Sequence, residues 1–226
     1  YLFNSLNLSN YRFNMLDNLK QLSFLRDNKH YVSPNFKGYN YFLIFTKINN
    51  NSYCVAIDKK KFSYHKNKLN IKILKIIKLK IMTSSSMFRG SIFDCKLIYN
   101  NNKYFMIVKD CYKFFGNDLT TMDMIEKMTY LNGIIRNQIT DCKYFTFKIN
   151  KLFEYEELDK LINEIIPKSK FDIQGIIFLP VYSGIQIIYT NNKKQKVNIE
   201  NNESIVNTTH DMIVNIDKIL TSRVYS

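Results

Sequence analysis

The feature that most constrains the fold is a pair of β-rich runs, Ser91–Tyr99 and Tyr104–Phe115, joined by the loop Asn100-Asn101-Asn102-Lys103. In the first run, apolar side chains occupy every second position: Phe93, Cys95, Leu97 and Tyr99. The positions between them hold Asp94, Lys96 and Ile98. A period of two is typical of a strand with one buried face. Asparagine tolerates the left-handed conformation that a short hairpin loop requires. We therefore expect an antiparallel hairpin, buried on one face, in the middle of the chain.

The composition favours a folded domain and an anionic partner. Of the 226 residues, 46% are hydrophobic and 15% aromatic, which is enough for a sizeable core and argues against disorder. The net charge of +14 comes almost entirely from lysine, and it favours RNA, DNA or a membrane surface as partner. An A/T-rich genome gives the same excess of Lys, Asn, Ile and Tyr without a binding role. Because the lysines are spread along the chain, both interpretations stay open.

The cysteines and the absence of long apolar runs indicate an intracellular protein. No C-x-x-C pair occurs among the cysteines Cys54, Cys95, Cys111 and Cys142. Three of them lie in predicted strands, so we expect core thiols in a reducing compartment, no metal site and no cofactor. There is no signal peptide and no apolar run of about 18 residues. We expect a soluble, cytoplasmic protein, and the first residue, Tyr1, suggests a piece of a longer chain.

The remaining periodicities predict an α+β fold. We expect further strands over Tyr41–Ile48, Tyr53–Ile57, Ile71–Ile81, Phe171–Leu179 and Gly184–Thr190, and an extended segment over Ile139–Ile149. We expect helices over Phe13–Leu25, after a cap at Thr120 or Thr121, over Glu154–Ile166 and over Thr209–Leu220. The spacing of Ile71–Ile81 also fits a helix. Hairpin connections predict antiparallel sheets flanked by helices. We divide the chain into an arm and helix (1–30), a central domain (31–190) and a C-terminal loop and helix packed on it (191–226).

Five segments together resemble the covalent nucleotidyltransferases, the superfamily of mRNA capping guanylyltransferases and of DNA and RNA ligases. The segment Tyr31–Asn40, followed by a hairpin ending in Val55–Lys59, is similar to their K-x-D-G-x-R motif and the strands after it. Arg89–Phe93 stands where that family has D-G-E-hydrophobic. Lys109–Gly116 has the spacing of F-D-x-L-x-x-x-G, and Phe171–Phe178 resembles E/D-G-hydrophobic-hydrophobic-F. Gly184–Thr190 stands where the family has a strand bearing K-x-K. The resemblance covers roughly residues 13–190 and implies a guanylyltransferase/ligase-like fold.

The departures from this pattern imply a catalytically inactive relative, a pseudoenzyme. The family's nucleophilic lysine stands three residues before the motif glycine, and Asn35 occupies that position here. An amide cannot form the phosphoramidate that an amine forms. Lys37 is two positions out of register, and a slip along the chain points a side chain elsewhere. Other catalytic positions of the family hold Ser91, Lys109, Gln174, Ile187, Ile188 and Tyr189.

The chain after Thr190 also departs from the capping enzymes and ligases, which continue into an oligonucleotide-binding barrel. Only the 36 residues 191–226 follow, too few for a five-stranded barrel. This arrangement resembles the cap-binding domain of the snurportins, which has the guanylyltransferase fold without the catalytic lysine or the barrel. The resemblance implies binding of the mRNA cap through an aromatic side chain, for which Tyr189 is the nearest candidate, although the chain has no tryptophan.

We therefore predict a module that binds RNA 5′ ends or the cap nucleotide. Tyr189 would stack on a base, Lys37 and Lys59 would bind phosphates, and Asn40 and Gln174 would form hydrogen bonds. For each of these residues taken singly, an ordinary strand or surface role is the favoured interpretation. The first alternative is a structural subunit, without nucleotide, of a viral or parasite transcription, capping or translation complex. The second is an active nucleotidyltransferase that uses Lys37. We expect protein partners and no membrane, in the cytoplasm or in a virus factory or virion.

Overall fold

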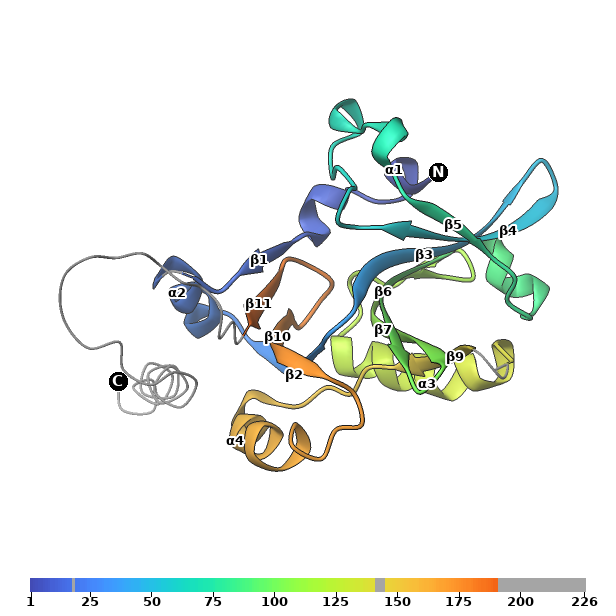
Figure 1. The fold of residues 1–226 in the computed structure, drawn as a ribbon. Coiled ribbons are helices and arrows are strands. Elements are labelled where there is room, and N and C mark those ends of the chain that lie inside the picture. The colour runs from blue at the N-terminus through green and yellow to red at the C-terminus, as the bar shows by residue number, and fades with distance from the viewer. Residues whose placement is uncertain (18, 141–144, 191–226) are drawn as a thin grey trace.

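The structure, a computed structural model, describes residues 1–17, 19–140 and 145–190 and consists of two β-sheets with helices around them (Figure 1). The small sheet has the order β1 (Phe13–Met15), β11 (Gln186–Thr190), β10 (Ile173–Pro180) and β2 (His30–Phe36). The large sheet has the order β5 (Ile76–Leu79), β4 (Asn51–Asp58), β3 (Tyr39–Ile48), β6 (Ser91–Asn100), β7 (Lys103–Phe114) and β8 (Asn117–Asp118). A further strand, β9 (Phe145–Ile149), pairs in parallel with β7. The predicted α+β class with antiparallel sheets is confirmed.

The central hairpin has the predicted form. Strands β6 and β7 are antiparallel, and the turn residues Asn101 and Asn102 have φ values of 48° and 57°. The turn between β3 and β4 is built in the same way: Asn49 and Asn50 also have positive φ values. Both turns use asparagine because this side chain tolerates the left-handed region better than most others.

The central hairpin differs from the prediction in its burial. Asp94 is 0% exposed and Lys96 is 2% exposed, so the polar positions of β6 are as buried as the apolar ones. The small sheet faces this side of β6, with Asn35 of β2 on Lys96 and Gln186 of β11 on Asp94. The prediction of a single buried face is therefore wrong, because a second sheet covers the face that period-two alternation assigns to solvent.

The longest helix, α3 (Met124–Gln138), covers the other face of the large sheet. Its predicted apolar stripe is buried there: Met124, Met128, Leu131 and Ile135. The cap is not Thr120 or Thr121 but Asp123, whose carboxylate accepts hydrogen bonds from the backbone N–H groups of Ile125 and Glu126. Asp123 is the residue immediately before the first helical turn, where a carboxylate reaches those N–H groups.

The other helices are short. They are α1 (Leu2–Ser5), α2 (Leu19–Asp27) and a segment of 3-10, α and π turns over Tyr155–Glu157, α4 (Leu158–Lys160) and Leu161–Ile165. Short 3-10 turns lie at Leu8–Tyr11, Lys66–Lys68, Ile71–Ile73 and Ser85–Arg89. The last helical segment lies within the predicted Glu154–Ile166 and packs Leu158 and Leu161 against the small sheet. No helix of the described residues is long and apolar enough to cross a membrane.

Three predicted elements differ from the observed ones. The predicted helix Phe13–Leu25 divides into β1 and α2, because β1 pairs in parallel with β11. The predicted strand Ile71–Ile81 contains a 3-10 turn followed by the shorter β5. Of the predicted extended segment Ile139–Ile149, the part Phe145–Ile149 forms β9. The predicted helix Thr209–Leu220, the rest of segment 191–226 and Cys142 lie outside the described residues. The other three cysteines, Cys54, Cys95 and Cys111, are free and buried, as predicted for core thiols.

Candidate functional site

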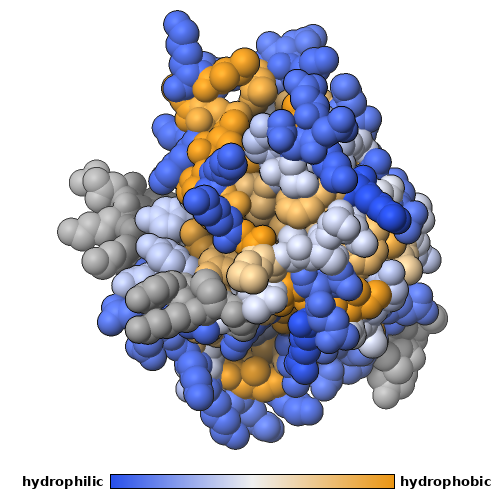
Figure 2. Space-filling view, turned by 90° about the vertical axis from the view of Figure 1, so that its right-hand side faces the viewer, coloured by the Kyte–Doolittle hydropathy of each residue, from blue (hydrophilic) through white to orange (hydrophobic). Residues whose placement is uncertain are grey.

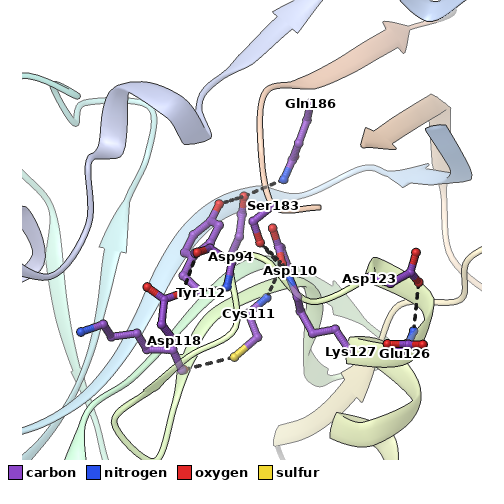
Figure 3. Close-up of polar contacts among 12 residues, drawn as sticks. Asp94, Asp110, Cys111, Tyr112, Asp118, Asp123, Glu126, Lys127, Ser183 and Gln186 are labelled. Atoms are coloured by element: carbon purple, nitrogen blue, oxygen red, sulfur yellow. Dashed lines mark hydrogen bonds and ion pairs between the residues drawn. The ribbon is translucent and has the colours of Figure 1, made fainter. Parts of the chain in front are cut away.

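A buried polar cluster lies between the two sheets, with Asp94 at its centre. Asp94 Oδ2 accepts from Lys59 Nζ at 2.7 Å and from Gln186 Nε2 at 3.1 Å, and Oδ1 is 3.1 Å from Lys109 Nζ. The hydroxyl of Tyr112 also donates to Oδ2, at 3.3 Å (Figure 3). Gln186 belongs to β11, Asp94, Lys109 and Tyr112 belong to the large sheet, and Lys59 follows its strand β4, so these contacts join the two sheets. We call this cluster, together with Lys96 and Asn35, the seam.

The charges of the seam act strongly on one another. Burial opposes ionisation of Asp94, but the ammonium groups of Lys109 and Lys59 outweigh it and lower the pKa of the carboxyl to about 2. Burial in turn lowers the pKa of Lys109. The carboxylate is therefore ionised at neutral pH and holds two lysines in the interior.

Lys96 occupies the end of the seam next to Asn35. Its Nζ donates to Asn35 Oδ1 at 2.7 Å and to the backbone oxygen of Phe36 at 2.6 Å. Burial, together with the charges of Lys109 and Lys59 and against the opposing effect of Asp94, lowers the pKa of Lys96 to about 7. Asn35 stands where the resemblance to the nucleotidyltransferases places the nucleophilic lysine. The side chains of this chain thus fill the space around that position.

A second buried ion pair ties α3 to the large sheet. Lys127 Nζ donates to Asp110 Oδ1 at 2.8 Å and to the hydroxyl of Ser183 at 2.6 Å, and that hydroxyl donates to Asp110 at 3.0 Å (Figure 3). Asp110 lies opposite Asp94 in the ladder between β6 and β7. Each carboxylate thus has its own lysine partners, and this second cluster is balanced in charge.

An open groove of about 830 Å³ lies on the α3 side of the large sheet, where Tyr41, Ala56 and Met106 line it. Its aromatic side chains include Tyr39, Tyr99 and Tyr104, which are 67%, 60% and 46% exposed. The rings of Tyr99 and Tyr104 lie 4.8 Å apart between centroids. The charged residues that line the groove are Lys37, Lys75, Lys170 and Asp172. The groove therefore combines exposed aromatic rings with an excess of positive charge.

The turn between β2 and β3 forms one rim of this groove. Lys37 donates its backbone N–H to the backbone oxygen of Asp172 at 2.8 Å, which holds the turn against the segment before β10. A Cβ atom on Gly38 would lie 2.4 Å from the backbone oxygen of Leu97, so the turn approaches β6 too closely for any side chain. Glycine is needed at this position for that close approach.

The structure divides the predicted site residues among three places. Lys37 and Gln174 both line the groove. Lys59 lies in the seam, and its backbone N–H donates to the backbone oxygen of Asn40 at 2.9 Å, so these two are neighbours. Tyr189 packs on the far face of the small sheet, against the apolar cluster that α4 covers. The predicted set is therefore not a single site, and Tyr189 is next to neither the groove nor the seam.

The residues at the centre of the seam and of the groove are missing from the predicted site residues. Asp94 and Lys96 stood out only as the polar half of an alternating strand, and Lys109 only as a departure from a motif. Charged side chains at two alternate positions of a strand rich in Phe, Ile and Cys were an available signal of a buried polar cluster. Tyr99 and Tyr104 flank the predicted hairpin loop, so a pair of neighbouring aromatic rings could also have been predicted from the sequence. Among the described residues, no group of three or more His, Cys, Asp or Glu side chains could hold a metal ion.

Comparisons with known proteins give distant similarities. No family profile matches the chain. An uncharacterized protein of Acanthamoeba polyphaga mimivirus is 21% identical over 178 residues, which cover 78% of this chain and 53% of that protein. The chain thus spans about half the length of this relative. Among solved structures, an apo RNA ligase mutant of Naegleria gruberi matches with a TM-score of 0.41 and 11% identity, over 83% of this chain and 60% of the ligase chain.

Proposed function

We propose that this chain is a catalytically inactive, nucleotidyltransferase-like module that binds RNA 5′ ends in the groove. The observation that carries the proposal is the presence of exposed tyrosine rings and three lysines around one open groove. Bases stack on aromatic side chains with about 1–3 kcal/mol per base, and lysines pair with phosphates. The net charge of +14 adds attraction for a polyanion at longer range. The similarity to a mimivirus protein supports a viral source.

Each wall of the groove suits a different part of a 5′ nucleotide. Tyr99 and Tyr104 offer a stacking surface, and Lys37 and Lys170 offer charge for the phosphates. Asp172 and Gln174 line the same groove and offer acceptors for the N–H groups on the edge of a guanine. A methylated, positively charged guanine would gain further from stacking on tyrosine. The mRNA cap is therefore the 5′ end that we expect to bind most tightly.

The RNA proposal is tested with Tyr99→Ala. Fluorescence anisotropy at fixed salt would compare capped, 5′-triphosphate and 5′-hydroxyl forms of one short single-stranded RNA. Loss of one stacking partner should weaken binding about 5- to 100-fold. The matched control is Tyr130→Ala on α3, which removes another exposed tyrosine outside the groove and should leave the affinity unchanged. Equal binding by the wild type and Tyr99→Ala would contradict the groove as the RNA site.

Catalytic inactivity rests on the residues at the position of the nucleophile. Asn35 has an amide, the nearby Lys96 amine is held by two acceptors, and Lys37 lies on an exposed turn. Incubation with labelled GTP or ATP and Mg²⁺ or Mn²⁺, followed by denaturing electrophoresis, should show no covalent label. A label that disappears in Lys37→Ala or Lys96→Ala would overturn this part of the proposal and leave RNA binding untouched.

A structural role in a larger complex is the second candidate. Two observations favour it: the seam is filled by the chain's own side chains, and Ile71, Ile73 and Ile76 are exposed in and before the edge strand β5. Figure 2 shows a band of apolar side chains bordered by hydrophilic ones on one face of the molecule. If none of the three RNA forms binds at low salt, the structural role replaces RNA binding.

A further inference from the structure

One edge of the large sheet is a strand with a neighbour on one side only. Among the strands of the described residues, β5 pairs with β4 and stands at the end of the sheet (Figure 1). The backbone oxygen of Lys75 accepts from the N–H of Asp58, so the backbone groups of Lys75 point toward β4. In an antiparallel ladder this direction alternates from residue to residue. The backbone N–H and C=O groups of Ile76 and Lys78 therefore point outward, away from β4.

The two faces of β5 differ in chemistry. Ile77 and Leu79 lie on the α3 side, where they line the groove and pack against the core. Ile76 and Lys78 alternate with them and belong to the opposite face. Ile76 is 54% exposed, and the ammonium group of Lys78 lies 5.1 Å from the centre of the Tyr53 ring. One face of β5 is therefore apolar, and the other carries a lysine beside an exposed isoleucine.

The chain around β5 is both basic and apolar. Segment 59–93 contains no aspartate or glutamate. Lysines stand in or near β5 at Lys72, Lys75, Lys78 and Lys80. Ile71 and Met82, on either side of the strand, are also largely exposed. An open strand edge with exposed aliphatic side chains is a template for another strand. Two copies of this edge would bring like charges together, which is unfavourable. The charges therefore favour an acidic partner over a second copy of the chain.

We propose that the outer edge of β5 binds an extended segment of an acidic protein partner, which joins the large sheet as a further strand. The outward backbone groups of Ile76 and Lys78 hydrogen-bond to this segment, as in other cases of strand addition. The side chains of the segment alternate, with apolar ones beside Ile77 and Leu79 and acidic ones beside Lys78. RNA suits this edge less well, because aliphatic side chains offer it neither stacking nor charge. The proposal does not depend on RNA binding in the groove.

The first experiment titrates the full chain into a fluorescent peptide of about eight residues in which valine and glutamate alternate. Fluorescence anisotropy at fixed low salt measures the binding. The matched peptide carries lysine in place of every glutamate. We expect saturable binding of the valine–glutamate peptide and at least about tenfold weaker binding of the valine–lysine peptide. Equal affinities for the two peptides, or no saturable binding of the valine–glutamate peptide, would overturn the proposal.

Peptides with methylated backbones distinguish strand addition from simple attraction between charges, and they need only the wild-type protein. In an extended peptide, the valine amides point to one edge and the glutamate amides to the other. Methylation of all valine amides or of all glutamate amides therefore blocks opposite edges at unchanged charge. We expect one methylated peptide to bind like the parent and the other to lose about tenfold or more in affinity. Equal affinities of the two methylated peptides would show that the peptide does not add as a strand.

Two variants test whether the peptide binds at β5. Lys78→Glu reverses the charge of the edge and should weaken binding of the valine–glutamate peptide about 3- to 10-fold. Its matched control, Lys47→Glu, changes an exposed lysine of β3 and should bind like the wild type. Ile76→Pro removes one outward N–H, which spares the ladder with β4, and should weaken binding to a similar extent. Equal binding by Lys78→Glu and Lys47→Glu would place the peptide elsewhere and overturn the proposal.

Two further measurements test the other possible occupants of the edge. Sedimentation of the wild type and of Ile76→Pro should show a monomer in both cases. A dimer that Ile76→Pro abolishes would assign the edge to a second copy of the chain. Anisotropy with 5′-hydroxyl RNA should give the same affinity for Lys78→Glu and Lys47→Glu. RNA binding that only Lys78→Glu weakens, without binding of the valine–glutamate peptide, would assign the edge to RNA.

Discussion

At the scale of single residues, Asp94 has the largest effect on how the two sheets meet. It is fully buried and contacts side chains from β7, from β11 and from the residue after β4. Its carboxylate compensates two lysines whose burial would otherwise be costly. A buried ion pair of this kind adds little net stability compared with apolar packing, but removal of one partner leaves a charge uncompensated in the interior.

We therefore expect Asp94→Asn to destabilise the fold by about 3–5 kcal/mol. The asparagine keeps the shape of the side chain, so the loss reflects charge: Lys59 and Lys109 lose their shared counter-ion. Urea unfolding followed by circular dichroism measures the difference. The control, Asp159→Asn at an exposed position of α4, should change stability by about 0.5 kcal/mol or less. A small effect of Asp94→Asn would mean that the lysines reach water or lose their protons.

Predictions from the sequence were least accurate for the positions of individual side chains. Lys37 and Gln174 were predicted site residues, and both line the groove. Tyr189 was chosen because it is the nearest aromatic residue in the strand where the family has its last motif, but its side chain packs on the helix-covered face of the small sheet. Which face a strand residue occupies depends on the register with neighbouring strands, and one strand alone does not determine that register. The partners of Asp94 are separated from it by up to 92 residues, so no local pattern identifies them.

At the scale of elements, the sequence predicted what local chemistry determines. The central Asn-Asn hairpin was predicted because its turn residues must adopt positive φ, and they do so in the structure. The stripe of α3 was predicted because four apolar residues recur at helical spacing and are all buried. In contrast, Phe13–Met15 is a strand only because it pairs with Gln186–Ile188, more than 170 residues away in the sequence. Such non-local pairing overrides a weak helical pattern.

At the scale of the whole molecule, the charges of the seam make stability depend on pH. The pKa of Lys96 is about 7 in the folded chain, against an ordinary value of 10.5. Between these values the unfolded chain binds a proton that the folded chain lacks, so stability rises with pH. Burial raises the pKa of the thiols Cys54, Cys95 and Cys111, which has the opposite effect once unfolded thiols ionise near pH 9.

We therefore expect the free energy of unfolding to rise between about pH 7 and 8.5, by at most about 1.4 kcal/mol per pH unit. Urea unfolding at several pH values in phosphate-free buffer measures this slope. Lys96→Met should show a smaller slope, and Lys47→Met should keep the slope of the wild type. A wild-type stability that falls or stays level over this range would show that Lys96 remains charged in the folded protein.

The turn from Phe36 to Gly38 connects the seam to the groove. Two successive residues of β6 contact it: Lys96 Nζ donates to the backbone oxygen of Phe36, and the backbone oxygen of Leu97 lies close to Gly38. A shift of this short piece of chain would therefore alter the interior polar cluster and the tyrosine-lined surface together. Substitutions that weaken either contact should therefore change both the seam and the groove, so neither can be altered independently of the other.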